Sequence, residues 1–322
     1  VNDLAAVGGD LELVAPHPLV AADRSLLLVA EHTWGLDQKT WLPDATNWNK
    51  SGLARLRETA AGRFFESSWR EQRDYVDSAA DILGGPWRTS LHAASGVDAP
   101  MQFMRISERE AMIADPPIDA DGTPLGGDHG FSPVGPGEVI DGGPWRLEVD
   151  PVDGSLVSLV EQDVDRVVAD REHRLGLLRY QSFDAGDYEH FYAGLSPVPD
   201  DEWWARWDNT KPGIESVAEA RSGLWTPVEA KAWHATSRGG DLHDLMIRVR
   251  FADDLTEDLG PPPHAWIRWF WTTEVEPRGH SDIEVTVWWP HKPANRLPEA
   301  LWFSFVPVVV EPNRWQMEKL GQ

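Results

Sequence analysis

Residues 145–163 read WRLEVDPVDGSLVSLVEQD, and this stretch decides the fold that we expect for the chain. Two strand-like runs flank the dipeptide Asp153-Gly154, which favours a tight turn and so predicts a β-hairpin. Later runs have the same strand-like character and are separated by Pro, Gly and Asp. Long strands joined by such turns predict a large antiparallel β-sandwich. These later runs are residues 242–251, 264–276, 281–290 and 300–310.

The N-terminal part of the chain has the pattern of helices instead. From Leu53 to Leu83, apolar side chains recur at helical spacing, which predicts one long amphipathic helix with a disturbance at Gly62. Gly84-Gly85-Pro86 is a strong signal for its end. Residues 21–34 fit either a short helix or a strand. A helix of ~30 residues needs helical partners to bury its apolar stripe, and we expect such partners upstream of Val1.

These patterns predict an α+β fold, mainly β, that is divided at a region rich in Pro and Gly. We expect a helical-bundle segment over residues 1–90, a connection with the first β elements over 91–143, and the β-sandwich over 144–322, truncated at its C-terminus. Within the sandwich, residues 186–222 are aromatic, acidic and irregular. Such a segment is typical of a long functional or edge-covering loop.

The charge of the chain excludes two classes of partner. The sequence has 53 Asp and Glu against 29 Lys and Arg, a net charge of −24. Such a surface repels nucleic acid and anionic lipid. No apolar run approaches the ~18 residues of a membrane helix, and we recognise no signal peptide, so we expect a cytoplasmic protein. Because the chain has no cysteine, disulfides, thiolate metal sites and cysteine nucleophiles are excluded.

Tryptophan is unusually frequent, with 18 Trp against four Tyr. The flat apolar face of Trp suits stacking on the C–H face of a sugar ring, although Trp is also a large core residue. We expect most of the tryptophans in the core. Trp203, Trp204 and Trp207 do not follow strand alternation and are better candidates for exposed aromatic side chains. Such exposed aromatic side chains could contact a sugar, and the resemblance described below implies a carbohydrate as the partner.

Residues 31–48, EHTWGLDQKTWLPDATNW, gather charged and aromatic side chains around a Gly and a Pro. His32 with Glu31 and Asp37 forms one cluster of candidate metal ligands or sugar contacts. A His before a helix can also cap that helix or bond to a carbonyl, and this interpretation stays open. Two further clusters, for which solvated loop charges are the simpler interpretation, are Asp187, Glu189 and His190, and Asp241, His243 and Asp244.

Three stretches together resemble a known family. Residues 142–170, GGPWRLEVDPVDGSLVSLVEQDVDRVVAD, resemble the opening of the C-terminal β-sandwich of glycoside hydrolase family 38, the α-mannosidase superfamily. Residues 31–48, followed by the helix that contains SSWREQRDYVDSAADIL, resemble the helical bundle of an uncharacterised branch of that superfamily. Residues 292–305, KPANRLPEALWFSF, resemble its late β segment.

In that superfamily, a seven-stranded β/α barrel precedes the helical bundle and a β-sandwich of the mutarotase-like type. The resemblance implies a divalent metal, typically zinc, held by barrel residues and by one His just before a bundle helix. His32 stands at that position, although Thr33 follows it where the family has Asp. The resemblance therefore implies His32 as a metal ligand. The substrate-contacting residues that it implies are Glu31, His32, Trp34 and Asp37.

The barrel itself is not expected in this chain, because no strand–helix repeat precedes Ser25. The catalytic nucleophile and at least two metal ligands would then lie in that missing N-terminal barrel, which becomes an expected partner. No catalytic residue is expected in the chain itself.

Three functional interpretations remain open. The first is the bundle and sandwich part of a retaining α-mannosidase-like glycoside hydrolase, inactive as this chain alone. The second is a non-catalytic module that binds carbohydrate or serves a structural role. The third is a sandwich enzyme of its own, such as a mutarotase-like epimerase or a polysaccharide lyase. An epimerase needs a Glu and a His that face one groove, and its candidates are Glu284, Glu299, His264 and His291.

Overall fold

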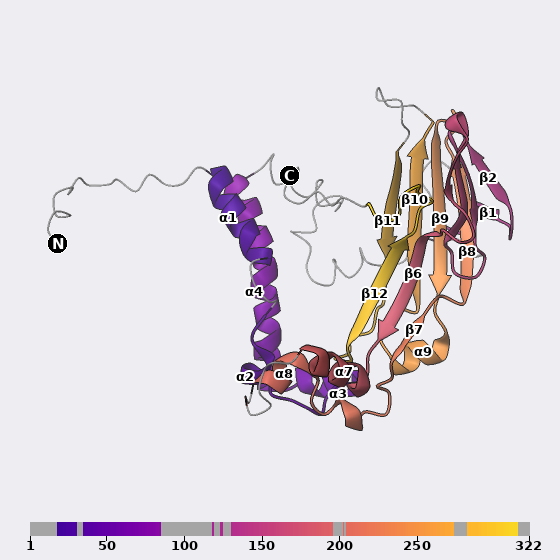
Figure 1. The fold of residues 1–322 in the computed structure, drawn as a ribbon. Helices are drawn as coiled ribbons and strands as arrows, with labels where there is room; N and C mark the ends of the chain where they lie inside the picture. The colour runs from indigo at the N-terminus through magenta and orange to yellow at the C-terminus, as the bar shows by residue number, and fades with distance from the viewer. Residues whose placement is uncertain are drawn as a thin grey trace, which may run out of the picture. The chain divides into compact units, whose positions relative to one another are not determined.

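The computed structural model contains two compact units (Figure 1). Residues 1–43 and 56–111 form the helical unit, and residues 44–55 and 112–322 form the sandwich unit. The fold is a mixed α+β one, with N-terminal helices followed by two open antiparallel sheets, as the sequence predicts. The residues whose structure is described are 18–30, 35–84, 118, 123–124, 130–195, 202, 204–273 and 282–314.

The helical unit contains α1 (Pro18–Ala30), α2 (Gln38–Trp41) and α4 (Ala60–Leu83). α1 begins with a proline, at the position where a helix tolerates the missing N–H. Residues 21–30 are therefore helical rather than a strand. α1 and α4 pack together, and small side chains allow their close approach. Within the described ranges, no helix is both long and apolar enough to cross a bilayer. The most deeply buried side chains of α1 and α4 are Ala22, Ala79 and Ala80.

The single long helix predicted over residues 53–83, with a disturbance at Gly62, is instead two helices: the chain forms α3 (Lys50–Arg57) and α4, and the break between them lies just before Gly62. The Thr59 side chain caps α4 by accepting a hydrogen bond from the N–H of Gly62 at 3.0 Å. Gly62 lies so close to the Leu56 carbonyl that a Cβ at this position would collide with it. The glycine is therefore required by the tight turn between the two helices.

The predicted end of the long helical pattern is confirmed. Gly84 follows the last residue of α4 with φ of +71°, in the left-handed region that favours glycine. Its N–H donates to the Ala80 carbonyl at 3.1 Å, which satisfies one of the carbonyls that the helix end leaves unpaired.

The predicted hairpin is confirmed in the seven-stranded sheet. Its two strands pair antiparallel, and the turn between them places Gly154 at φ of +75°. The strand order is β12-β6-β4-β3-β2, with β5 paired to β4 and β7 paired to β6. The strands are β2 (Val139–Gly142), β3 (Trp145–Val149), β4 (Leu156–Glu161), β5 (Arg166–Ala169), β6 (Leu175–Ser182), β7 (Gly223–Trp225) and β12 (Glu299–Phe305).

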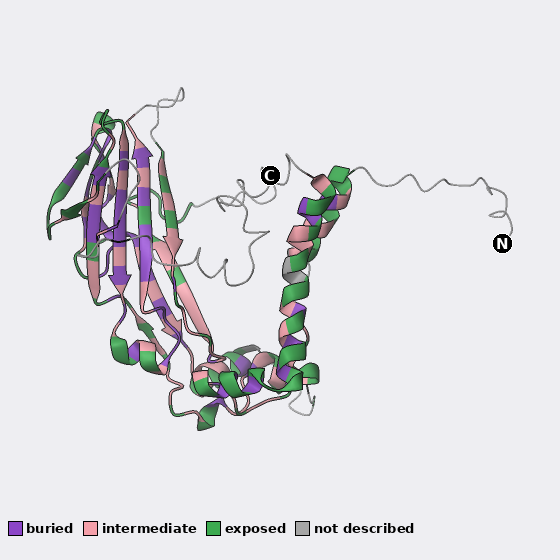
Figure 2. Ribbon diagram, turned by 180° about the vertical axis from the view of Figure 1, so that it is seen from behind, coloured by how far each residue is buried: buried purple, intermediate pink, exposed green. Residues whose placement is uncertain are grey.

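The five-stranded sheet has the order β1-β8-β9-β10-β11, and all of its pairs are antiparallel. The four later runs predicted as strands form β9 to β12. Side chains that point inward alternate with side chains on the outer face, and Figure 2 shows this as bands of different burial along the strands. The strands are β1 (Ser132–Val134), β8 (Glu229–Thr236), β9 (Leu242–Arg250), β10 (His264–Thr272) and β11 (Ile283–Trp288).

The core lies between the two sheets, which pack face to face. Trp271 of β10 lies over Gly142 of the other sheet, where a Cβ would come within 2.6 Å of the indole. The Trp271 indole N–H also donates to the Gly142 carbonyl at 2.9 Å. Trp269 lies over Gly176 in the same manner, at 2.5 Å from the position of a Cβ. Two glycines of the seven-stranded sheet thus leave the space in which tryptophan side chains of the five-stranded sheet pack.

Residues 186–222, expected as an irregular loop, contain short helices. The first of them begins with a reciprocal cap: the Asp184 carboxylate accepts from the N–H groups of Gly186 (2.8 Å) and Asp187 (3.2 Å), and the Asp187 carboxylate accepts from the Asp184 N–H (2.9 Å). The acidic residues that suggested a loop therefore start a helix. The helices and 3-10 turns of the sandwich unit are η1 (Gln162–Val164), α7 (Ala185–Leu195), α8 (Ala205–Asn209), η2 (Ile214–Ser216) and α9 (Asp253–Asp258).

Residues 44–55 precede the helix α4 in the chain and yet belong to the sandwich unit. Trp48 is buried in the core of the two sheets. The Arg296 guanidinium lies 4.5 Å above the centre of the Trp48 ring and donates to the carbonyls of Asp44 (2.9 Å) and Asn47 (3.3 Å). The Arg296 N–H donates to the Trp48 carbonyl at 2.8 Å. These contacts fasten the segment to the loop that precedes β12.

We predict that Gly154→Ala destabilises the sandwich more than Gly137→Ala does. Both glycines have φ near +75°, so both substitutions carry a backbone cost of ~1–2 kcal/mol. A Cβ at Gly137 meets open space, whereas one at Gly154 collides with Val249 of the facing sheet, which adds ~1–3 kcal/mol. Urea denaturation followed by tryptophan fluorescence measures both. Equal losses of unfolding free energy would show that Gly154 has no packing role.

Candidate functional site

Of the four predicted substrate contacts, Glu31, His32, Trp34 and Asp37, only Asp37 lies in the described part of the chain. Glu31, His32 and Trp34 lie outside it, so the structure does not test their predicted sugar contacts or the metal ligand His32. Asp37 precedes α2, and its carboxylate accepts hydrogen bonds from Thr40 and from Lys39 (3.0 Å). The bond from Thr40 is the main cause that lowers the pKa of Asp37. Its contacts are therefore local ones at the start of a helix.

The clusters of acidic residues and His do not converge in the sandwich unit. Asp187 caps α7, and both oxygens of Glu189 lie 3.2 Å from Arg206. Asp244 accepts two hydrogen bonds from Arg268 on the outer face of the five-stranded sheet, at 2.9 and 2.7 Å, whereas His243 is buried on the inner face.

The described residues therefore do not supply a zinc site. Over these ranges, no group of three or more His, Asp or Glu side chains is placed to hold a metal ion.

His243, which is buried, instead stacks with the half-buried His234 in a contact that the sequence did not reveal. The His234 Nε2 and His243 Nδ1 atoms lie 3.1 Å apart, and both rings stack nearly parallel to Trp271. Burial lowers the pKa of both imidazoles, and this outweighs the nearby carboxylates. One ring donates a hydrogen bond to the other, and the lowered pKa of both residues favours their neutral forms.

The residues considered for a mutarotase-like site are also held by other contacts. The two carboxylate oxygens of Glu299 accept from Tyr180 (2.9 Å) and from Lys292, and the Tyr180 hydroxyl accepts from the Gly260 N–H at 3.0 Å. His264 and His291 lie together, with ring centres 6.4 Å apart. Glu284 is exposed on β11. Glu299 thus has the contacts of a structural carboxylate.

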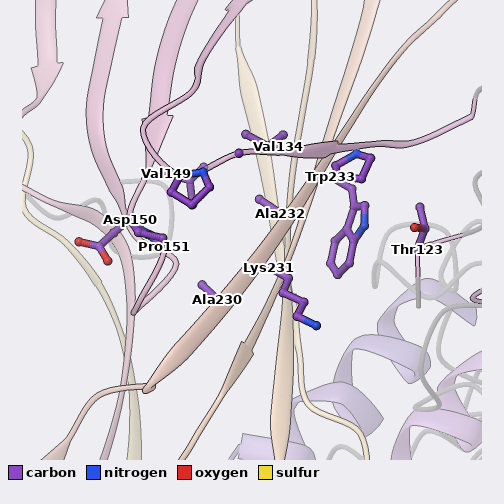
Figure 3. Close-up of a pocket in the computed structure, with 12 residues that line it drawn as sticks. Thr123, Val134, Val149, Asp150, Pro151, Ala230, Lys231, Ala232 and Trp233 are labelled. Carbon is purple, nitrogen blue, oxygen red and sulfur yellow. The ribbon is translucent and has the colours of Figure 1, made fainter. Parts of the chain in front are cut away.

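A cleft with a volume of about 380 Å³ lies where β1 meets β8 (Figure 3). Most of its lining is apolar, from Val134, Ala230 and neighbouring prolines. Trp233 contributes little surface, because it is 5% exposed. The cleft therefore offers no open aromatic face for a sugar ring.

An exposed aromatic face is found on the seven-stranded sheet, at the edge strand β12. Trp302 is 48% exposed, whereas its neighbours Leu301 and Phe303 pack against the core. Strand alternation therefore directs Trp302 to the outer face. Its indole N–H donates to the Gln181 side-chain oxygen at 2.9 Å, which fixes the orientation of the ring.

Polar side chains lie around Trp302 on the same face. Arg179 is paired with Trp302 across β6 and β12, and its guanidinium donates to the Ser304 hydroxyl at 2.8 Å. Leu224 of β7 is opposite Gln181 and is also exposed. We call these five residues the Trp302 surface: Arg179, Gln181, Leu224, Trp302 and Ser304.

The Trp302 surface was not identified from the sequence. Trp302 lies in the quoted stretch 292–305, and the alternation in ALWFSF places it opposite to Leu301 and Phe303, which was the available signal. Its partners come from β6 and β7, and no sequence pattern gives their register. Of the tryptophans expected to be exposed, Trp204 and Trp207 are half-buried and Trp203 lies outside the described residues.

A comparison with protein-family models finds one match. The model described as a domain of unknown function, DUF5054, matches residues 20–107 and 123–277, about three quarters of the chain. The matched residues include parts of both the helical unit and the sandwich unit. No curated protein matches the chain.

The stacked pair of the half-buried His234 and the buried His243 predicts a loss of stability in mild acid. The unfolded chain takes up protons at its His residues near pH 6.5, whereas the folded pKa of both residues is lower. Below pH 6.5 the unfolded state therefore binds more protons, and the free energy of unfolding falls as the pH decreases. Urea denaturation between pH 7.5 and 5.5 should show a smaller decrease for the double variant His234→Phe/His243→Phe.

Imidazole resonances of the wild-type protein give a second readout that does not require a stable variant. Two His residues should titrate with midpoints below the value of a free imidazole. The account of the pair fails if no such midpoints are found, or if the double variant has the same pH dependence as the wild type.

Proposed function

This chain belongs to the DUF5054 family, and we propose that it is the carbohydrate-binding part of a glycoside hydrolase of the α-mannosidase type. The Trp302 surface is the observation that carries this proposal. Further support comes from the resemblance of residues 142–170 and 292–305 to the sandwich of that superfamily. Two antiparallel sheets packed face to face are also consistent with a mutarotase-like sandwich.

The indole of Trp302 has the properties of a sugar-stacking platform. A pyranose presents a face of C–H groups, which packs on an exposed aromatic ring and removes apolar surface from water. The hydrogen bond to Gln181 holds the ring in one orientation before a ligand arrives. Little side-chain entropy is then lost on binding.

The rim of the Trp302 surface can recognise sugar hydroxyl groups. Ser304 accepts from Arg179 and keeps its own O–H for donation. The Gln181 amide nitrogen provides two donors, and the Arg179 guanidinium provides more. The flat aromatic face of Trp302 therefore suits the C–H face of a sugar ring, and the donors beside it suit the hydroxyl groups at the edge of that sugar.

In this proposal the chain contributes binding and the missing barrel contributes the nucleophile. Glu31, His32, Trp34 and Asp37 are the proposed substrate contacts of the helical unit. The alternative, a non-catalytic carbohydrate-binding module, would use the same Trp302 surface. It differs from the hydrolase proposal only in that no catalytic barrel accompanies it. No described contact favours the mutarotase-like enzyme, since the Glu299 carboxylate is occupied by Tyr180 and Lys292.

We predict that Trp302→Ala weakens carbohydrate binding by about tenfold or more, the equivalent of ~1.4 kcal/mol. The measurement is affinity electrophoresis of the native protein through gels containing soluble α-mannan, with α-glucan and β-xylan gels in parallel. Trp302→Phe retains a ring face and should bind within ~3-fold of the wild type. The matched control is Trp41→Ala, because Trp41 is 49% exposed and lies in the helical unit.

Equal retardation of the wild type and Trp302→Ala in all three gels would refute the Trp302 surface as a binding site. So would an equal loss of binding in Trp302→Ala and Trp41→Ala. Binding to one polysaccharide that Trp302→Ala abolishes supports the site and identifies the sugar.

A second prediction concerns catalysis. The chain alone should release no 4-nitrophenol from 4-nitrophenyl α-mannoside above the rate without protein, because its nucleophile is expected in the barrel. Turnover that persists after repurification would contradict the assignment of the nucleophile to a missing part. The same assay on a longer protein that contains a barrel should show turnover.

A further inference from the structure

A small pocket on the outer face of the five-stranded sheet is lined almost entirely by basic side chains. Glu229, Arg250 and His264 lie opposite one another across β8, β9 and β10. Lys231 and Arg248 form the next cross-strand row together with Trp266. Directly paired residues share a face of a sheet, so these side chains converge. Together they line a pocket of about 190 Å³, which we call the basic pocket: Glu229, Lys231, Arg248, Arg250 and His264.

The cations of the basic pocket are not all neutralised. Arg250 is matched by two carboxylates, Glu229 at 2.9 Å and Asp253 at 3.0 Å. The hydrogen bond from Arg250 is the main cause that lowers the pKa of Glu229. Lys231 lies 3.8 Å from the second oxygen of Glu229, at the limit of an ion pair. Positive charge therefore remains on the Lys231 side of the pocket.

Arg248 is held by an aromatic ring rather than by a carboxylate. Its guanidinium lies 5.8 Å from the centre of the Trp266 ring, and Trp266 is fully buried beneath it. Among the described residues, no Asp or Glu lies within ion-pair distance of Arg248. A guanidinium that rests on a rigid ring keeps its N–H donors free for a planar or tetrahedral anion.

This concentration of positive charge runs against the rest of the molecule. The net charge of the chain is −24, and carboxylates are abundant enough to pair with every cation. A protein surface of this sign gains nothing in solubility from an unneutralised basic pocket. The exception is explained if an anion from solution completes the pocket.

We propose that the basic pocket binds one oxyanion group between Lys231 and Arg248. The volume of about 190 Å³ is several times that of one water (~30 Å³) and lies below the range of whole drug-sized ligands (~300–1,000 Å³). It therefore accommodates a single phosphate, sulfate or carboxylate group. Arg248 supplies a fork of donors and Lys231 a compact charge. This inference does not rest on the carbohydrate proposal, which concerns the other sheet.

The test is calorimetric titration of the full chain with inorganic phosphate, sulfate and acetate in separate experiments at low ionic strength, where charge interactions are least screened. Arg248→Gln should weaken binding about tenfold or more, since it removes charge-assisted hydrogen bonds. The matched control is Arg146→Gln, an exposed Arg on β3 of the other sheet, which should bind as the wild type does.

Glu229→Gln gives a test with the opposite sign. It removes the single carboxylate of the pocket lining, so anion binding should become several-fold tighter. If Glu229 only maintained the shape of the pocket, its substitution would instead weaken anion binding. All four proteins should have the same far-ultraviolet circular dichroism, because the changed side chains lie on outer faces.

Any of three results would overturn the proposal. The first is no heat of binding for any of the three anions at 20 mM, which is on the order of the weakest useful affinity. The others are equal affinities of Arg248→Gln and the wild type, or weaker anion binding by Glu229→Gln than by the wild type. The anion that binds most tightly distinguishes the source of the group. Preference for phosphate or sulfate indicates an ester of these acids, and preference for acetate indicates a carboxylate such as that of an acidic sugar.

Discussion

The sandwich depends on the fit of large side chains of one sheet into positions where the other sheet has glycine. Trp271 and Trp269 of β10 lie against Gly142 and Gly176, and neither glycine could carry even a methyl group. Because close-packed interiors tolerate little change in volume, these contacts set the distance between the sheets and their relative registers. The side chains of Trp269 and Trp271 are therefore held in fixed positions at the centre of the sandwich unit.

This constraint also determines what the outer faces carry. On each strand the residues between two inward side chains must point outward, so Trp302 and Arg248 reach the surface because their neighbours are committed to the core. Both side chains are further held by a partner, Gln181 for the Trp302 indole and Trp266 for the Arg248 guanidinium. The two proposed binding surfaces are therefore rigid parts of the sheets rather than features of loops, and they lie on opposite faces of the sandwich.

The strands and the hairpin could be predicted from the sequence, because alternation and a tight turn are local properties. A disturbance at Gly62 could also be predicted, but not a complete break before α4, since the break depends on the approach of Gly62 to the Leu56 carbonyl and the helical periodicity continues across it. The same limit applies to the sites. Asp241, His243 and Asp244 are neighbours in sequence, yet alternation sends His243 inward to His234 and Asp244 outward to Arg268. The basic pocket and the Trp302 surface require the register of three strands each, which no local pattern contains.

The attachment of residues 44–55 to the sandwich has a consequence for how such a protein can evolve. The chain leaves the helical unit, contributes Trp48 to the core of the sheets under the Arg296 guanidinium, and then returns to the helical unit. A single crossover between genes cannot transfer either unit intact, because any one cut separates the sandwich from its own tryptophan or the helical unit from part of itself. The match to the family model accordingly extends over parts of both units.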